Sequence, residues 1–170
     1  GICTFYVALF RGTPIVVQLL VAYYALMPMF GANLPGIQVA MIVFGMNSGA
    51  YISEIMRSGI QSVDSGQMEA GRAVGLSFGT SMMKIVIPQA VKNILPTLGN
   101  EFIALIKETS VVSFIAVSDL YMAFNYIGTN SYEFMVPYLV MALIYIMLVL
   151  IITLLVRILE RSLKKSDRRN

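Results

Sequence analysis

The sequence contains no histidine and has a single cysteine, Cys3. Without histidine, the chain can form neither a His-based metal site nor an imidazole general base. One cysteine cannot form a disulfide within the chain. The phosphate-binding pattern G-x-x-x-x-G-K-[ST] is also absent, so we expect no nucleotide phosphate to be held by a P-loop here. These absences exclude several classes of enzyme.

Charged residues are scarce as well. They make up 12% of the 170 residues, whereas soluble domains carry about 25%. Hydrophobic residues reach 58%, which predicts an integral membrane protein. The N-terminus lacks a charged region followed by an apolar stretch, so no signal peptide is predicted. Because the chain opens with Gly1 rather than Met, we expect a further N-terminal piece to precede it.

Long apolar runs predict membrane-spanning helices. The run at 134–156 has 23 residues without a charge, and at about 1.5 Å per residue it can cross a hydrocarbon core of about 30 Å. Three further spans are predicted at 15–30, 37–56 and 94–117. Gly45 and Gly49 lie four apart in the second of these, and they either admit a close neighbouring helix or have no such partner.

The basic residues predict the topology. They lie before the first span, between the second and third, and in the tail at 157–170: Arg11; Arg57, Arg72, Lys84 and Lys92; Arg157, Arg161, Lys164, Lys165, Arg168 and Arg169. The positive-inside rule then places both ends and the segment 57–93 in the cytoplasm. We therefore predict an all-α, polytopic transmembrane helical bundle with about four spans and a basic cytoplasmic tail.

The cytoplasmic segment 57–93 predicts two short helices joined by a sharp turn. Asp64 or Ser65 can cap the first, which would stop at Gly75, where a left-handed conformation is cheap. Ser77 can cap the second, and Pro88 should end it because proline lacks an amide hydrogen. The glycines at 71, 75 and 79 suggest close approach to another surface, although a solvated loop with incidental glycines remains the alternative.

The stretch "EAGRAVGLSFGTSMMKIVIPQA" resembles the EAA loop of ABC importer permeases, with its E-A-A, glycine and I-x-L-P elements at the family spacing. Gly71 replaces the third-place Ala, and Ile87 replaces the Leu. Other stretches resemble the polar amino acid uptake subfamily: "LFRGTP" at 9–14, "AYISEIMRSGI" at 50–60, "PQAVKNILPTLGNEFIALIKETSVVS" at 88–113 and "SDL" at 118–120. The resemblance covers nearly the whole chain.

The resemblance implies a MetI-like bundle, usually of five spans, with the missing one before Gly1. It implies an ABC importer permease subunit of the bacterial inner membrane, for an amino acid of the glutamine, glutamate, arginine, histidine or cystine class. Its implied partners are a second permease subunit, an extracytoplasmic amino-acid-binding protein and an ATPase dimer that binds ATP and magnesium. The implied ATPase-coupling residues are Glu69, Ala70, Gly71, Arg72, Gly75, Ile85 and Pro88.

Two polar clusters are candidates for the substrate path. Lys107, Glu108, Thr109 and Ser110 interrupt the 94–117 span, and charges there are tolerated only facing protein or water. They line a passage or shape a helix break, unless Lys107 pairs with Glu108 or Glu101 to support packing. Asn47, Tyr51 and Glu54 share a face with Ser48 nearby, and they either line the passage or form interhelical hydrogen bonds.

Other functions are less well supported by the sequence. A passive channel or ATP-independent transporter would have no use for a docking helix. A membrane hydrolase could use Ser77 in "GLSFG" with Glu69 and Asp64, but a histidine base and a strand-turn-helix setting are missing. No interleaving of aromatic and basic residues suggests nucleic-acid binding. We therefore expect a transport subunit that carries out no bond chemistry and holds no cofactor itself.

Overall fold

The computed structural model describes residues 1–167, with side chains to residue 161. It confirms the all-α prediction, because every regular element in that part of the chain is helical. In chain order the elements are α1 (Ile2–Gly12), α2 (Ile15–Leu20), the π-helix η1 (Val21–Leu26), α3 (Met27–Met29), α4 (Gly36–Gln61), α5 (Ser65–Ala73), α6 (Phe78–Ser81), the π-helix η2 (Met82–Val86), α7 (Ile87–Glu108), the 3₁₀ helix η3 (Thr109–Ile115), α8 (Leu120–Ser131) and α9 (Met135–Asp167).

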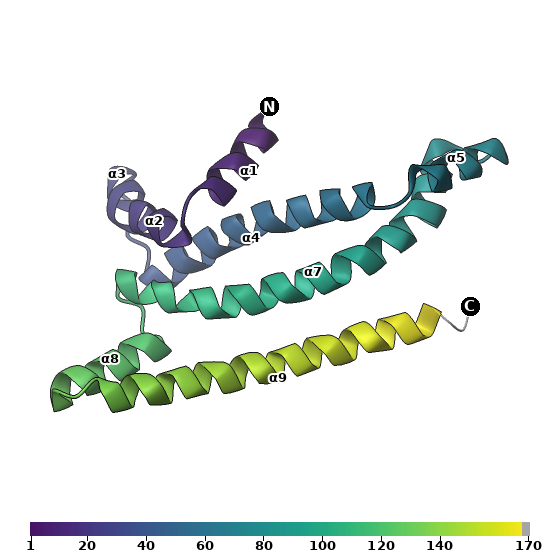
Figure 1. The fold of residues 1–170 in the computed structure, drawn as a ribbon. Coiled ribbons are helices and arrows are strands. Elements are labelled where there is room, and N and C mark those ends of the chain that lie inside the picture. The colour runs from purple at the N-terminus through teal and green to yellow at the C-terminus, as the bar shows by residue number, and fades with distance from the viewer. Residues whose placement is uncertain (168–170) are drawn as a thin grey trace. The chain divides into compact units, whose positions relative to one another are not determined.

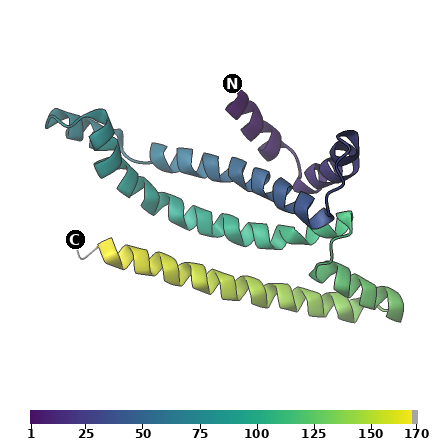
Figure 2. The same ribbon diagram turned by 180° about the vertical axis from the view of Figure 1, so that it is seen from behind.

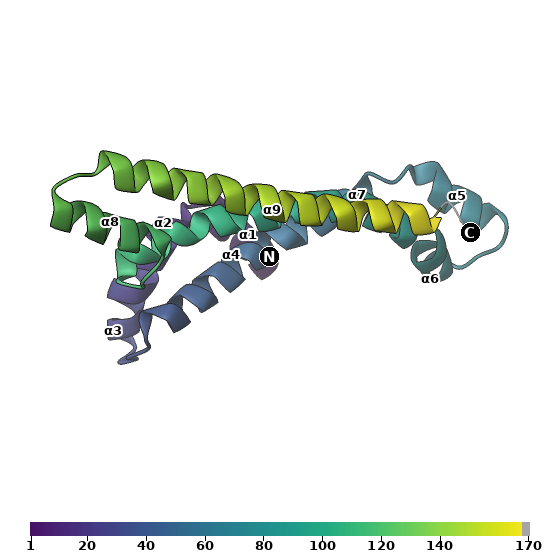
Figure 3. The same cartoon turned by 90° about the horizontal axis from the view of Figure 1, so that it is seen from below.

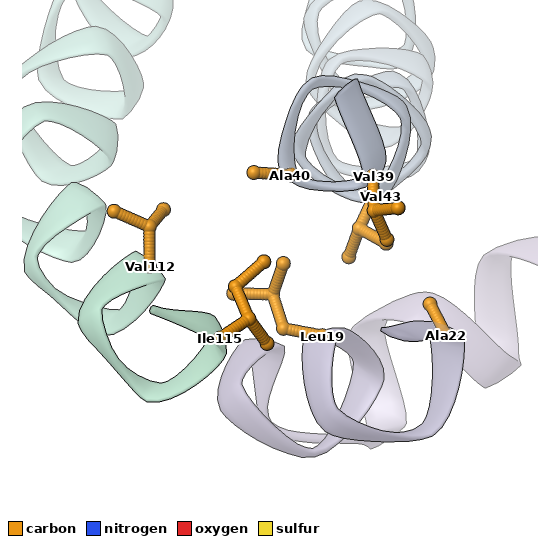
Figure 4. Packing of buried hydrophobic residues seen from close by; sticks show 7 residues of the cluster. All are labelled: Leu19, Ala22, Val39, Ala40, Val43, Val112 and Ile115. Atoms are coloured by element: carbon orange, nitrogen blue, oxygen red, sulfur yellow. The ribbon is translucent and has the colours of Figure 1, made fainter. Parts of the chain in front are cut away.

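The chain forms two compact units. Unit 1 consists of Gly1–Tyr51 with Ile103–Ile152, and unit 2 consists of Ile52–Phe102 with the chain from Thr153 onward. The core of unit 1 joins α2 and η1, the start of α4, and η3. Its buried members are Leu19, Ala22, Val39, Ala40, Val43, Val112 and Ile115, and Figure 4 shows Leu19 and Ile115 packed between the helices.

A sharp corner separates α1 from α2, visible near the N-terminus in Figure 1. The two segments Ile2–Gly12 and Ile15–Met29 meet at 108°. Pro14 disfavours a helical conformation for the residue before it, and Thr13 is accordingly extended, with φ −125° and ψ 143°. The predicted span at 15–30 therefore corresponds only to the second arm of a bent pair. The prediction missed the helix at residues 2–12.

Helix α8 turns back alongside the first turns of α9, as Figures 1 and 2 both show. Asp119 caps α8 by accepting a hydrogen bond from the amide of Met122 at 2.8 Å. The phenol of Tyr138 donates to Asn125 Oδ1 at 2.9 Å. Gly128 is buried beneath the ring of Phe134, which lies where a Cβ would be. The loop 132–134 therefore closes tightly between two packed helices.

Unit 2 contains the end of α4, the short helices α5 and α6, η2 and the first part of α7. Figure 3 shows α5 and α6 folded together as a hairpin. Gly59 near the end of α4 packs on Ile94 of α7 so closely that a Cβ would collide with it. Helix α4 continues to Gln61 and α7 begins at Ile87, so the helices extend several residues into the segment that the sequence assigned to the loop.

Two single helices are long and apolar enough to cross a membrane, Gly36–Gln61 and Met135–Arg161, and the bent pair would make a third among the described residues. These agree with the predicted runs at 37–56 and 134–156. The segment 94–117 is instead divided, because α7 ends at Glu108 and a 3₁₀ helix follows. The division into four spans stays a prediction. The tail residues Lys164, Lys165, Arg168 and Arg169 lie outside the residues whose side chains are described.

Candidate functional site

The hairpin of α5, α6 and η2 begins with a side-chain cap. The carboxylate of Asp64 accepts a hydrogen bond from the amide of Gly66 at 2.7 Å, and it satisfies one of the free amides at the start of α5. The cap predicted at Asp64 or Ser65 is confirmed at Asp64. Helix α5 then runs to Ala73, as the sequence indicated.

The turn after α5 is closed by backbone hydrogen bonds. Gly75 has φ +88°, and the amides of Gly75 and Leu76 donate to the carbonyls of Arg72 at 3.0 Å and Gly71 at 3.2 Å. This pair of bonds is the Schellman arrangement, which needs a left-handed residue at the position of Gly75. The next helix is capped by Ser77, whose hydroxyl accepts from the amide of Thr80 at 3.2 Å. Both predictions for this turn are confirmed.

Pro88 does not end the second helix, so that prediction is wrong. Helix α6 continues through η2 directly into α7, which contains Pro88 in its first turn. The wide π turn of Met82–Val86 changes the hydrogen-bond register just before the proline. A missing amide hydrogen is tolerated there, so the hairpin joins α7 without a break.

The three glycines of the hairpin occupy different environments. Gly71 is buried, and a Cβ there would lie 2.8 Å from Ser81 Oγ and 2.8 Å from Ile85 Cδ1. The small size of Gly71 therefore allows α5 to pack on the chain's own helix. A Cβ on Gly79 would meet no atom within 4 Å. Among these glycines, the structure places Gly79 rather than Gly71 on an open surface.

The exposed face of the hairpin combines charge with apolar side chains. Glu69, Ala70 and Arg72 are exposed on α5. Val74 is 78% exposed, Phe78 is 55% exposed and Met83 is 67% exposed. Sequence reasoning missed these last three residues, although apolar side chains in a segment predicted to lie in water were the available signal. We call this set, Glu69, Ala70, Arg72, Val74, Phe78 and Met83, the hairpin face.

Two side-chain hydrogen bonds attach the base of the hairpin to α7. Gln89 Nε2 donates to Gln67 Oε1 at 3.2 Å, and Asn93 Nδ2 donates to Ser62 Oγ at 2.9 Å. These bonds tie the start of α5 and the residues just after α4 to the first turns of α7.

The predicted path residues of α4 make separate interactions. Asn47 is 7% exposed and donates hydrogen bonds to Phe10 O at 3.2 Å and Gln18 Oε1 at 3.0 Å. Tyr51 lies beneath the guanidinium of Arg11, at 5.6 Å from the ring centroid. Glu54 pairs with Arg57 one turn further along. Of the two alternatives for this cluster, lining a passage or forming interhelical hydrogen bonds, the structure shows the second for Asn47.

The second predicted cluster marks the end of α7. Lys107 and Ser110 line a cavity of about 480 Å³ together with four residues of α9, Tyr145, Ile146, Val149 and Leu150. Thr109 donates its hydroxyl hydrogen to Ile106 O at 2.7 Å, which supports the change from α to 3₁₀ geometry. Within the part of the chain that the structure describes, Lys107 has no ion pair, so the packing role through a pair with Glu101 or Glu108 finds no support.

Among the residues that the structure describes, no group of three or more His, Cys, Asp or Glu side chains lies together in a way that could hold a metal ion. The cavity near Lys107 has a mainly aliphatic wall with three polar groups, the ammonium of Lys107 and the hydroxyls of Ser110 and Tyr145. The end of α7 and the middle of α9 thus line this cavity together.

Comparison with protein families places residues 1–165 within the model described as "Binding-protein-dependent transport system inner membrane component". The chain is similar to the arginine transport system permease protein ArtQ of Bacillus subtilis, with 40% identity over 139 residues, covering 82% of this chain and 64% of the relative. It is 40% identical to a putative glutamine transport system permease protein of Rickettsia bellii, covering 81% of this chain and 63% of that one.

An L-cystine transport system permease protein, TcyB of Bacillus subtilis, is 41% identical over 128 residues, which are 75% of this chain and 54% of the relative. Among solved structures, the chain resembles one described as the crystal structure of an amino acid ABC transporter with histidines. The TM-score is 0.87 at 42% identity, with coverage of 94% of this chain and 74% of that one. The chain thus spans less than two thirds of the length of these three permease relatives.

Proposed function

The chain belongs to the family of binding-protein-dependent transport system inner membrane components, and from this premise we propose that it is part of a permease subunit that imports a polar amino acid. The relatives carry arginine, glutamine and cystine in their names, which supports an amino acid as the substrate class. Energy would come from a separate ATPase pair, which would bind the ATP and magnesium. The chain would carry out no bond chemistry.

The hairpin face carries this proposal, because its exposed residues include both apolar and charged side chains. Val74, Phe78 and Met83 are exposed, and Glu69 and Arg72 are exposed on α5. A surface of this composition is typical of a protein interface. We assign Glu69, Ala70 and Arg72 to docking on the ATPase, and Gly71, Gly75, Ile85 and Pro88 to the shape of the hairpin.

Coupling would proceed by alternating access. Movement of the ATPase pair would shift the hairpin, and the bonds from Gln89 and Asn93 would pass the shift to α7. The polar end of α7, Lys107 to Ser110, would then change its exposure along the substrate path. A second permease subunit and an extracytoplasmic binding protein would complete the importer, with residues 57–93 and the C-terminal tail in the cytoplasm.

The test measures how much ATPase co-purifies with the complete permease in mild detergent. The test variant is Glu69→Arg with Val74→Asp, since both residues are exposed and neither substitution disturbs packing. The matched control places the same two side chains in the α8–α9 region, as Asn130→Arg with Tyr132→Asp, where both residues are exposed.

We expect stoichiometric ATPase on the wild type and the control, and at least about a tenfold loss on the test variant, because a charge introduced at an interface core is strongly unfavourable. Equal ATPase on all three proteins would show that the hairpin face is not the docking surface. A folded wild type that transports its substrate without binding ATPase would favour a passive channel instead.

A further inference from the structure

The corner between α1 and α2 leaves backbone carbonyls without helical partners. Helix α1 ends at Gly12, and Pro14, which has no amide hydrogen, directly precedes α2. The last carbonyls of any helix need partners from elsewhere. In apolar surroundings no water is present to donate hydrogen bonds to these carbonyls, so side chains or other backbone groups must donate them. Thr13 also contributes to this helix end, because its hydroxyl donates a hydrogen bond to Leu9 O in the last turn of α1 at 2.8 Å.

Gln18 supplies most of the remaining donors. Its Nε2 donates to Phe10 O at 2.9 Å and to Thr13 O at 3.0 Å, and it lies 2.9 Å from the Thr13 hydroxyl. One amide thus satisfies a carbonyl in the last turn of α1 and the carbonyl of the corner residue Thr13. Its neighbour Leu19 is fully buried in the core of unit 1, which holds α2 and the base of Gln18 in place.

Asn47 connects the same corner to α4. Its Nδ2 donates to Phe10 O at 3.2 Å and to Gln18 Oε1 at 3.0 Å. Asn47 is 7% exposed and continues the buried face of α4 that contains Val39 and Val43. Both amide groups therefore have partners, and α1, α2 and α4 meet at this one pair of side chains.

Other residues of α1 contact the next turns of α4. The phenol of Tyr6 donates to the carbonyl of Met46, and its oxygen would lie 3.0 Å from a Cβ on Gly49. Arg11 stacks over Tyr51. Since α2 packs on Val39 and Val43 and α1 packs on residues 46–51, the two arms of the corner together contact α4 along most of its first half.

We infer that Gln18 and Asn47 form an amide latch that fixes the corner between α1 and α2 on α4, so that these helices move as one body during transport. Both are positioning residues: they act through the helix geometry and need not touch the substrate. Gln18 was not among the residues singled out from the sequence. Asn47 was singled out as a residue of the substrate path, but the hydrogen bonds of its buried amide favour a role in positioning the helices.

The experiment measures a distance in the complete, purified permease in lipid nanodiscs. Spin labels replace Phe5 on α1 and Ile42 on α4, two side chains that are 69% and 50% exposed, in a background where Cys3 is replaced by Ser. The variants are Gln18→Met and Asn47→Leu, which keep side-chain size and remove the donors. The control is Gln38→Met, which removes an exposed side-chain amide from α4, the helix that also contains Asn47.

We expect one narrow distance distribution for the wild type and the control, with and without trapped ATPase. Gln18→Met should give the broadest distribution and Asn47→Leu an intermediate one, because the first removes four of these hydrogen bonds and the second removes two, with the Asn47–Gln18 bond lost in both. The maximal transport rate per folded protein should fall by at least about tenfold in Gln18→Met, with an unchanged KM for the binding protein.

A narrow distribution in both Gln18→Met and Asn47→Leu would overturn the latch, as would equal broadening in the Gln38→Met control. The transport readout rests on the proposed function, but the distance readout does not. If the permease binds no ATPase and its distribution still broadens on Gln18→Met, the latch stands while the proposed function fails.

Discussion

Two sharp changes of direction in the chain, the hairpin turn at Gly75 and the corner at Pro14, are closed in different ways. The hairpin turn at Gly75 uses bonds between residues three to five positions apart, from backbone amides and the Ser77 cap. The corner at Pro14 depends instead on Gln18 and on Asn47, which lies 37 residues from its partner Phe10. The hairpin turn is closed by its immediate neighbours, whereas the corner takes its donors from Gln18 on its own second arm and from Asn47 on the helix that it packs against.

The largest effect should come from the core that supports the corner. Leu19→Ala removes a fully buried side chain and should destabilise unit 1 by about 2–5 kcal/mol. Hydrogen exchange in nanodiscs should speed up in α2 and the start of α4 while the hairpin stays protected. Val17→Ala, at a residue 44% exposed, is the control. Equal acceleration in the hairpin would show that the two turns are not independent.

At the hairpin, Gly75→Val should cost at least about 1–2 kcal/mol, because a side chain at φ +88° is strained and a branched one most of all. Gly75→Asn should cost less, since asparagine tolerates this conformation. Exchange rates of the amides of Gly75 and Leu76 report the difference. If both variants exchange like the wild type, the left-handed turn is not needed for the hairpin.

Removing the cap of α5 tests whether local bonds close the hairpin. Asp64→Ala should destabilise α5 by about 0.5–2 kcal/mol. Asp64→Asn should keep most of the stability of the wild type, because the amide oxygen of asparagine can still accept the hydrogen bond from Gly66. The amides at the start of α5 would exchange faster in the alanine variant alone. A response of α1 or α2 to this substitution would contradict the separation between the two turns.

The smallest effect should be at Gly79. Gly79→Ala meets open space and should leave stability unchanged or raise it by up to about 1 kcal/mol, since alanine favours helix. Gly71→Ala, by contrast, must displace Ser81 or Ile85 and should lower hairpin stability. The hydrogen-exchange rates of the α6 amides compare the Gly79→Ala and Gly71→Ala variants directly. A destabilising Gly79→Ala would mean that this position is covered by another part of the protein.

The same contrast explains what the sequence could predict. The hairpin was predictable in detail because Asp64, Gly75 and Ser77 act on residues within three or four positions of themselves. The long apolar runs likewise predicted α4 and α9. Pro88 misled the prediction because a π turn, which has no recognisable local pattern, moves the hydrogen bonds around the proline.

Long-range contacts escaped the sequence for a physical reason. Gln18 occurs within an apolar run as a single polar residue, and nothing adjacent shows that Phe10 and Thr13 need its donors. Asn47 was recognised as polar on a helical face, but spacing alone cannot distinguish a side chain that faces a passage from one that bonds to another helix. The role of Gly71 was also missed, because its neighbour Ser81 comes from the next helix.

The hydrogen bonds of Gln18 have a consequence for how the protein is made. Its partners Phe10 and Thr13 are eight and five residues earlier in the chain, so all three leave the ribosome before Asn47 does. The corner can therefore form before Asn47 reaches the lipid, and it would enter the lipid with several of its carbonyls already satisfied. Asn47 then arrives at a preformed acceptor, which orders the insertion of the helices in time.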